Sequence, residues 1–345
     1  MSKVAKMDSR RVMSVWGRIL MGHAPLLSIE ITRECPLRCP GCYAYGDEHL
    51  GGELTLRELS DLWGDDLVRG VVDTVRRHRP LQVSLVGGEP LVRHRELSRI
   101  LPEISRMGVH TLVVTSAVIR IPKEWMEIPL VRVAVSIDGL RQDHDVRRAP
   151  ATYDRILRNI EGCRVDISWV ITHQQMNRSG YLDEYLAFWS SRPDVDRIWL
   201  STYTPQVNEI SEETLTPEDQ RELIRRLPEL KLKYPALILI KGMEEAINTP
   251  PPNPEECMFS KMSVNYSADL KTRIEPCFFG GNPDCTKCGC AISTSLHWIG
   301  KKKLLGPVTV NHVVKSSIAV GSLVNQLRPG APPGLRRSHT LRTTA

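Results

Sequence analysis

The chain has 345 residues, of which 41% are hydrophobic and 25% are charged, and these are the proportions of a globular protein. Its apolar runs are too short to cross a membrane, which excludes a membrane-spanning protein. The formal net charge of +6 is concentrated in residues 301–345, which contain eight Lys and Arg and no acid. The rest of the chain is nearly neutral, so its composition does not indicate nucleic-acid binding.

The two ends of the chain have distinct compositions. Residues 1–24 are basic and amphipathic, and they predict a helix that packs Val12, Trp16 and Ile19 onto the rest of the protein. Because this segment lacks the long apolar core and the cleavage site of a signal peptide, we expect a cytoplasmic protein. The tail from residue 329 is rich in Pro and Gly, and we expect it to be disordered.

Between the ends, short apolar runs alternate with helical patterns. Six strands are predicted, at Leu26–Ile31, Leu81–Val86, Thr111–Thr115, Val131–Ile137, Val165–Ile171 and Arg197–Ser201. Helices are predicted at Leu56–Arg77, Arg93–Met107, Tyr153–Glu161, Leu182–Ser190 and Pro217–Leu230, the first with a capping box of Thr55 and Glu58. This alternation predicts an α/β fold with parallel strands, either a partial (β/α)6 TIM-like barrel or, as the alternative, an open doubly wound sheet.

A second region follows the last predicted helix. The segment NTPPPNPE reads as a linker because it suits neither a helix nor a central strand. We therefore expect an N-terminal helix at 1–24, the barrel at 25–247, a small cysteine-rich extension at 248–300 and a C-terminal cap with the basic tail at 301–345. Within the last part, residues 307–327 predict a strand followed by a helix.

Eight of the nine cysteines fall into two groups, which in a chain of this size indicates metal or redox chemistry. Cys35, Cys39 and Cys42 have the spacing C-x3-C-x2-C and follow the first predicted strand, at the end where parallel folds build their sites. Three thiolates can hold a [4Fe–4S] cluster and leave one iron open, whereas a ferredoxin fills all four positions. A zinc site with a fourth ligand from elsewhere is the alternative.

Three further motifs follow predicted strands. Gly87-Gly88-Glu89-Pro90 comes after the second strand, where glycines permit close backbone approach and a carboxylate can neutralise an ammonium group. The fourth strand is followed by Ser136-Ile-Asp138-Gly and then by a stretch that ends in Arg148. Val170-Ile171-Thr172 stands near the end of the fifth strand. Read singly, these motifs also suit a tight turn or a surface ion pair.

Taken together and in this order, the segments resemble the radical S-adenosylmethionine (radical SAM) superfamily over about residues 25–205. The family signature is C-x3-C-x2-C beside an aromatic residue, here Tyr43. The resemblance implies that Cys35, Cys39 and Cys42 bind the catalytic [4Fe–4S] cluster. It also implies a cosubstrate site for S-adenosylmethionine made by Tyr43, Gly87, Gly88, Glu89, Pro90, Thr115, Ser116, Ser136, Asp138, Arg148 and Val170.

In the family, the segment that resembles Gly87–Pro90 binds the methionine amino group. By the same resemblance Ser136 would bond the ribose, Arg148 would pair with the carboxylate, and Val170 would lie near the adenine. Asp138 would contact the ribose or the substrate. One departure is that the family commonly has Thr-Asn-Gly where this chain has Thr115-Ser116-Ala117, which leaves the part played by these residues open.

The second cysteine group comprises Cys257, Cys277, Cys285, Cys288 and Cys290. Five thiols are one more than a tetrahedral zinc or a four-ligand cluster needs. Placed after a radical SAM barrel, the group is similar to the auxiliary-cluster extensions called SPASM and Twitch. This similarity implies one auxiliary [4Fe–4S] cluster, with a hairpin formed by Lys261–Tyr266 and Thr272–Pro276. Zinc is again the alternative, and which four cysteines bind is left open.

The resemblance implies an enzyme in which an electron from the reduced cluster cleaves S-adenosylmethionine and the 5′-deoxyadenosyl radical abstracts hydrogen from a substrate. A low-potential donor, flavodoxin or ferredoxin, would supply the electron. Our first hypothesis is oxidative modification of, or bond formation in, an unidentified substrate. The second is a maturase of the SPASM type that modifies a peptide or protein side chain. Because about twenty-five residues precede the first strand, we expect that a leader-dependent peptide substrate is disfavoured or else needs a separate partner protein. A third hypothesis, from another class, is a zinc-stabilised nucleic-acid-binding protein.

Overall fold

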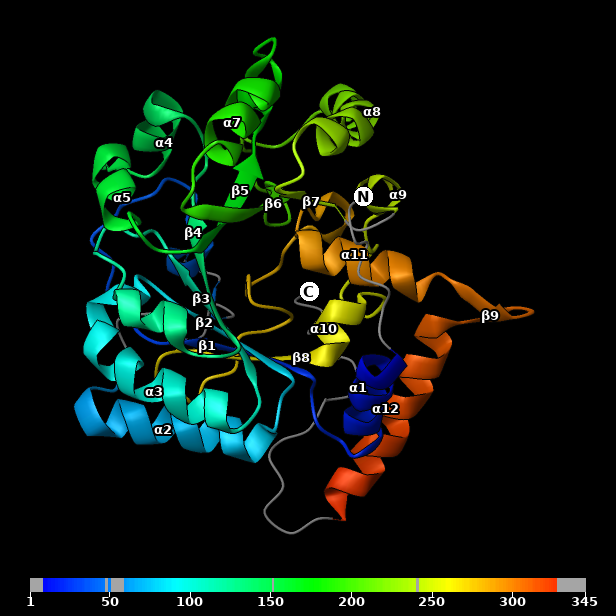
Figure 1. Ribbon diagram of the computed structural model, residues 1–345. Coiled ribbons are helices and arrows are strands. Elements are labelled where there is room, and N and C mark those ends of the chain that lie inside the picture. Colours follow the sequence, from blue (N-terminus) through cyan, green and yellow to red (C-terminus); the bar gives the residue numbers. More distant parts are fainter. Residues whose placement is uncertain (1–8, 47–48, 51–58, 151, 240–241, 328–345) are drawn as a thin grey trace.

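The computed structural model describes residues 9–46, 49–50, 59–150, 152–239 and 242–327. Its centre is an eight-stranded sheet in the order β7-β6-β5-β4-β3-β2-β1-β8 (Figure 1). The strands are β1 Leu26–Glu30, β2 Gln82–Val86, β3 His110–Thr115, β4 Val131–Ser136, β5 Val165–Ile171, β6 Val195–Thr202, β7 Leu237–Ile238 and β8 Ser263–Tyr266. Neighbouring strands pair in parallel throughout. The six predicted strands are confirmed, each to within two residues at either end, and they lie in sequential order as a partial barrel requires.

Helices connect the strands and cover one side of the sheet (Figure 1). They are α2 Gly64–His78, α3 His94–Arg106, α4 Arg141–Arg147, α5 Tyr153–Asn159, α6 His173–Met176, α7 Tyr181–Ser190 and α8 Pro217–Lys233, whereas α1 Ser9–Leu20 packs against the C-terminal helix α12 Val310–Gln326. Short 3-10 turns occur at η1 Tyr43–Tyr45, η2 Pro90–Arg93, η3 Lys123–Glu127 and η4 Cys285–Lys287. The C-terminal helices are α9 Met243–Asn248, α10 Met258–Met262, α11 Ala291–Gly300 and α12 Val310–Gln326, with a small antiparallel pair of β9 Lys303–Leu305 and β10 Val308–Thr309.

The core lies between the sheet and the helices. On α2, Leu67, Val71 and Val75 recur at helical spacing and are completely buried. Trp169 of β5 stacks on Tyr185 of α7 with ring centroids 3.8 Å apart. Burial of each such side chain contributes about 1.5–3 kcal/mol, so the core holds the strand ends in place.

The start of α2 differs from the prediction. The expected helix began at Leu56, but residues 60–63 are not helical and α2 begins at Gly64. Two features explain the later start. Asp61 accepts hydrogen bonds from the loop after β1, and the backbone of Gly64 has a positive φ of 52°. The capping box of Thr55 and Glu58 lies outside the described residues.

The segment after α9 returns to the sheet. β8 adds to the free side of β1, where Leu26 pairs with Ser263 and Ile29 pairs with Tyr266. The chain then turns back: the Ile274 N–H donates to the Asn265 carbonyl at 3.0 Å, and Tyr266 forms an antiparallel β-bridge with Arg273. This is the predicted hairpin, except that its first residues are helical and belong to α10. None of the helices in the described part of the chain is long and apolar enough to cross a bilayer.

Candidate functional site

Cys35, Cys39 and Cys42 lie in the loop that joins β1 to η1. Their thiols are free and partly exposed. The backbone N–H of Cys42 donates to the carbonyl of Cys39 at 3.3 Å, and Gly41 between them has a φ of +63°, so the loop turns tightly. Burial raises the pKa of the Cys35 thiol to about 11. A bound cation is therefore needed to make a thiolate of it at neutral pH.

The start of this loop is fastened by a residue that sequence reasoning missed. Asp61 accepts a hydrogen bond from the Thr32 hydroxyl at 2.6 Å and from both the backbone N–H and the Nε of Arg33, at 3.0 and 2.6 Å. Burial alone would raise the pKa of Asp61, but these donors lower it below its usual value. Asp61 therefore holds the backbone directly before Cys35 as an anion.

Gly87 and Gly88 pack against the same loop. The N–H of Gly88 donates to the Thr32 carbonyl and that of Glu89 donates to the Glu34 carbonyl, both at 2.7 Å. A Cβ atom on Gly88 would lie 2.3 Å from the Glu34 oxygen, and one on Gly87 would lie 2.5 Å from the Thr32 oxygen. The glycines are thus required for contact with the cysteine loop of the chain itself, a reason that the sequence did not show.

The Glu89 carboxylate is fully buried at the ends of β2 and β3. It accepts hydrogen bonds from the backbone N–H groups of Leu91 and Ser116, at 2.9 and 2.8 Å, and from the hydroxyls of Thr115 and Ser116. Thr115 and Ser116 therefore orient Glu89. Ala117, at the position of the family glycine, has a φ of +54° and keeps the backbone shape that a glycine would adopt there.

Asp138, beyond the end of β4, is completely buried and accepts from Arg147 and Arg148, the latter through Nε at 2.6 Å. Burial alone would raise the pKa of Asp138, but the charges of Arg148 and Arg147 lower it well below its usual value. Among the described residues, the terminal nitrogens of Arg148 bond no acceptor. Burial raises the pKa of the Cys39 thiol, and the nearby charge of Arg148 opposes that rise. The structure thus brings Arg148 to the cysteine loop.

Two further contacts fix this arginine pair. Arg147 makes a two-pronged ion pair with Glu213, at 2.7 and 2.8 Å, from the loop before α8. The N–H of Arg38, in the cysteine loop, donates to the carbonyl of Ala149 at 2.7 Å. Glu213 was not predicted, because nothing in the sequence links it to a residue on another loop.

The other predicted cosubstrate residues lie at the same end of the sheet. Ser136 is the last residue of β4, and Val170 of β5 donates its N–H to Asp138 at 3.3 Å. Pro90 begins η2 directly after Glu89. Tyr43 differs, because its ring contacts Phe278 and Phe279 of the C-terminal region, with centroids 5.9 and 5.3 Å away.

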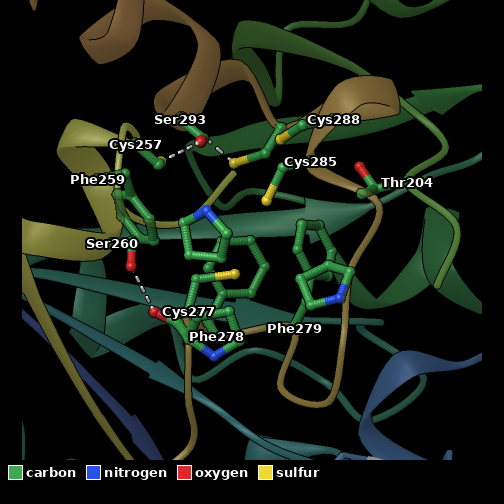
Figure 2. A pocket seen from close by; sticks show the side chains of 14 residues that line it. Thr204, Cys257, Phe259, Ser260, Cys277, Phe278, Phe279, Cys285, Cys288 and Ser293 are labelled. Atoms are coloured by element: carbon green, nitrogen blue, oxygen red, sulfur yellow. Dashed lines mark hydrogen bonds between the residues drawn. The ribbon is translucent and has the colours of Figure 1, made fainter. Parts of the chain in front are cut away.

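The five C-terminal cysteines line one hollow of about 350 Å³, which includes its opening to solvent. The hollow lies between α10, α11 and the end of β6, and Figure 2 shows the sulfur atoms of Cys277 and Cys285 facing each other across it. Ser293 of α11 links two of the thiols: its hydroxyl lies 3.1 Å from the Cys257 sulfur and its N–H donates to the Cys290 sulfur at 3.5 Å. Burial raises the pKa of Cys285 and of Cys290 to about 12.

The spacing of these thiols bears on the choice of metal. Among the described residues, no three His, Cys, Asp or Glu side chains converge as they would around one metal ion. A zinc ion draws its thiolates to about 2.3 Å from one centre. A [4Fe–4S] cluster binds each thiolate to a different iron and so needs a wider arrangement. Both cysteine groups supply thiols that either centre can use, so the choice between a cluster and zinc stays a prediction.

The two cysteine loops are joined by a buried histidine that sequence reasoning also missed. His49 lies 2.8 Å from the Phe279 carbonyl through Nδ1 and 2.8 Å from the Glu30 carboxylate through Nε2. Burial alone would lower the pKa of His49, but the hydrogen bond and the charge of Glu30 raise it. The signal in the sequence was Glu30 itself, a charge at the end of the otherwise uncharged strand LLSIE.

Comparison with known proteins gives one matching family model. Residues 29–176 match the Radical SAM superfamily. The chain is 25% identical over 162 residues to Fe-coproporphyrin III synthase of Methanosarcina barkeri, which is 46% of this chain and 38% of that protein. It is 31% identical over 118 residues to PqqA peptide cyclase of Bradyrhizobium diazoefficiens, which is 33% of this chain and 28% of that protein. The chain therefore spans less than half the length of these relatives.

The fold is also found in solved structures. The structure of native anSMEcpe with bound AdoMet aligns with a TM-score of 0.54 at 14% identity, and the alignment covers 88% of this chain and 98% of that one. At this identity the likeness shows a shared fold.

Proposed function

We propose that Cys35, Cys39 and Cys42 bind a [4Fe–4S] cluster and that S-adenosylmethionine binds beside it, because residues 29–176 match the Radical SAM superfamily. One observation carries this proposal: the three free thiols share one loop, and Arg148 from a distant segment lies beside it with its terminal nitrogens unbonded to any acceptor among the described residues. Three thiolates leave one iron open to a cosubstrate.

When bound, the reduced cluster supplies the electron that cleaves S-adenosylmethionine, and the 5′-deoxyadenosyl radical then abstracts hydrogen from the substrate. The residues of this chain hold the cosubstrate in place. Arg148 is oriented by Asp138 and offers a planar guanidinium to the carboxylate. Glu89, kept in position by Thr115 and Ser116, provides a buried anion for the amino group. Ser136 and Val170 lie on the strands where we place the ribose and the adenine.

For the second site we propose an auxiliary [4Fe–4S] cluster held by four of Cys257, Cys277, Cys285, Cys288 and Cys290. Its support is the hollow that all five thiols share. Aromatic rings of Phe259, Phe278 and Phe279 line the same hollow and make part of its wall apolar. A zinc-stabilised nucleic-acid-binding protein is not favoured, because it gives no account of the match of residues 29–176 to the Radical SAM superfamily.

The reaction that we propose first is oxidative modification of, or bond formation in, a substrate whose identity the site does not reveal. A low-potential flavodoxin or ferredoxin is the proposed electron donor, and the cytoplasm remains the predicted location. A second candidate is a maturase acting on a peptide or protein side chain. It is supported by the match to PqqA peptide cyclase of Bradyrhizobium diazoefficiens. Fe-coproporphyrin III synthase matches over a longer stretch. Because its name gives a porphyrin as the product, this match supports the first candidate.

The proposal is tested by iron and sulfide content after anaerobic reconstitution, together with 5′-deoxyadenosine formation from S-adenosylmethionine and dithionite. The variant Cys35→Ala/Cys39→Ala/Cys42→Ala removes the first site. The matched control is Cys163→Ala, which changes a buried free cysteine that belongs to neither group.

We expect about eight irons in the wild type and in the control, about four in the triple variant, and nucleoside from the wild type and the control alone. About four irons in the wild type and none in the triple variant would retain the radical chemistry and reject the auxiliary cluster. A wild type without iron and without nucleoside would reject the whole proposal.

A further inference from the structure

The two cysteine loops contact each other through the aromatic residues that follow their cysteines. Tyr43 comes directly after Cys42, and Phe278 comes directly after Cys277. Their rings meet edge to face, with centroids 5.9 Å apart and planes at 73°. Phe279 meets Tyr43 in the same way at 5.3 Å. Cys42 and Cys277 are thus connected by a short path of covalent bonds and one ring contact.

A buried ion pair holds this contact in place. Glu30 at the end of β1 and His49 in the loop after η1 are 3% and 2% exposed. Both ring nitrogens of His49 face acceptors, the Glu30 carboxylate on one side and the Phe279 carbonyl on the other. The second carboxylate oxygen of Glu30 accepts from the Ser267 hydroxyl at the end of β8 at 2.8 Å. The pair therefore ties β1, β8 and the Cys277 loop together.

The backbone of the Cys277 loop is shaped to fit His49. The N–H of Gly280 donates to the Cys277 carbonyl at 3.0 Å, which closes a tight turn. Gly280 has a φ of +66°, and a Cβ atom on it would lie 2.0 Å from the His49 carbonyl oxygen. A loop that merely lay near His49 would not need a glycine at this point. The close fit indicates one defined position for Cys277 relative to the first loop.

We propose that His49 and Glu30 are positioning residues that hold the Cys277 loop against the Cys42 loop, so that Tyr43 and Phe278 remain in contact and fix the separation of the two iron–sulfur sites. This inference rests on the proposed function, because it concerns the groups that the two loops bind. Its first consequence belongs to the protein itself: without the tie, the Cys277 loop opens even when no iron is present. Its second is that the magnetic interaction between two reduced clusters weakens.

The test compares the double variant Glu30→Met/His49→Phe with the wild type. Replacing both members of a buried pair with apolar side chains of similar size leaves no charge unpaired, so the fold is retained. The first measurement is amide hydrogen exchange over residues 276–282 in the iron-free protein. The second is the electron paramagnetic resonance spectrum of the reconstituted, reduced protein. The control is His78→Phe, which removes another buried histidine that bonds the Tyr266 hydroxyl at 3.1 Å and touches neither cysteine loop.

We expect exchange over residues 276–282 to become about tenfold faster in the double variant, the effect of losing one buried hydrogen bond, and to stay unchanged in the control. We also expect full iron content with a weaker magnetic interaction. Unchanged exchange would overturn the proposal, whatever the iron content. A spectrum identical to the wild type in a double variant that holds both clusters would overturn it too. A wild type that lacks the second cluster would contradict the proposed function, while the exchange measurement would still decide the role of His49.

Discussion

Arg148 donates its Nε to the fully buried carboxylate of Asp138 at 2.6 Å. This bond sets the direction of the guanidinium, because the remaining nitrogens of a planar fork are fixed once one edge is held. The family resemblance associated this aspartate with the ribose or the substrate. In the structure, its carboxylate binds the Arg148 side chain. Asp138 binds both Arg148 and Arg147, and its contact with the ribose or the substrate stays a prediction.

A first prediction concerns Arg148→Lys. A lysine ammonium cannot bond Asp138 and still offer two parallel donors to a carboxylate. We expect the reconstituted variant to bind S-adenosylmethionine about tenfold or more weakly, which corresponds to the loss of one charge-assisted hydrogen bond. Equilibrium dialysis measures the dissociation constant. Arg178→Lys, in an exposed pair with Asp143, is the control and should bind as the wild type does. Equal affinity in both variants would contradict the role assigned to Arg148.

A second prediction concerns the hydroxyls that hold Glu89. Thr115→Val keeps the shape of the side chain but removes two buried hydrogen bonds, one donated to the Glu89 carboxylate and one accepted from the Ala117 N–H. We expect the free energy of unfolding to fall by about 1.5–3 kcal/mol. Thr111→Val is the matched control on the same strand, because its buried hydroxyl has no hydrogen-bond partner among the described residues, and its removal should be neutral or stabilising. Urea denaturation of the iron-free proteins measures both, and equal losses would show that the bond to Glu89 carries no stability.

A third prediction contrasts two glycines. Gly88→Ala places a Cβ atom 2.3 Å from the Glu34 oxygen, so the loop that carries the first cysteine must shift. We expect iron binding at the first site to fall, with a loss of about 2 kcal/mol or more in the free energy of unfolding. Gly17→Ala, in α1, meets nothing within 4 Å and should stabilise the protein by about 0.5–1 kcal/mol. Iron content and urea denaturation together test the contrast, which fails if Gly88→Ala retains both.

A fourth prediction concerns acid. Burial, assisted by the nearby charges of Arg77, Arg273 and His23, lowers the pKa of His78 to about 3. The unfolded chain therefore binds a proton at His78 below about pH 6.5 while the folded chain does not, so this residue makes stability fall as the pH decreases from about 6.5 toward 3. Near pH 5 its contribution to the slope is about 1.4 kcal/mol per pH unit.

The variant His78→Gln isolates this effect, because other histidines titrate alike in both proteins. His144, whose pKa burial lowers to about 4, acts in the same direction, and His49, whose pKa is raised, acts in the opposite one. Denaturant unfolding of the iron-free proteins between pH 7 and pH 4 should show a shallower loss of stability in the variant. Parallel curves would show that His78 binds its proton equally well in the folded and the unfolded protein.

The strands and the first cysteine loop could be predicted because their signals are local. A buried parallel strand such as β5 is a continuous apolar run, and the predicted bounds at Val165 and Ile171 are those observed. The α2 start could not be predicted in this way, because the apolar residues Leu59, Leu62 and Trp63 continue the helical spacing. Asp61 keeps these residues out of the helix, because its carboxylate is bonded to Thr32 and Arg33 of another loop.

The contacts around the site depend on tertiary structure that local patterns do not contain. Glu89 was identified from its motif, but the four donors that surround it come from two separate strand ends. His49 and Phe279 lie far apart in the sequence, and each is unremarkable in its own segment. The helix α11 was missed because the Ser, Thr and Gly residues around Cys290 favour a loop reading.

The parallel pairing of β8 with β1 has a consequence for protein engineering. The strand that leads into Cys35 is flanked by β2 on one side and by a strand from the C-terminal region on the other. An exchange of C-terminal regions between relatives would thus replace part of the framework that supports the first cysteine loop, along with the second cysteine group. Successful chimeras should cross over after Tyr266 and keep the native β8, so that Cys257 stays native and only the outer loop with Cys277, Cys285, Cys288 and Cys290 is transplanted.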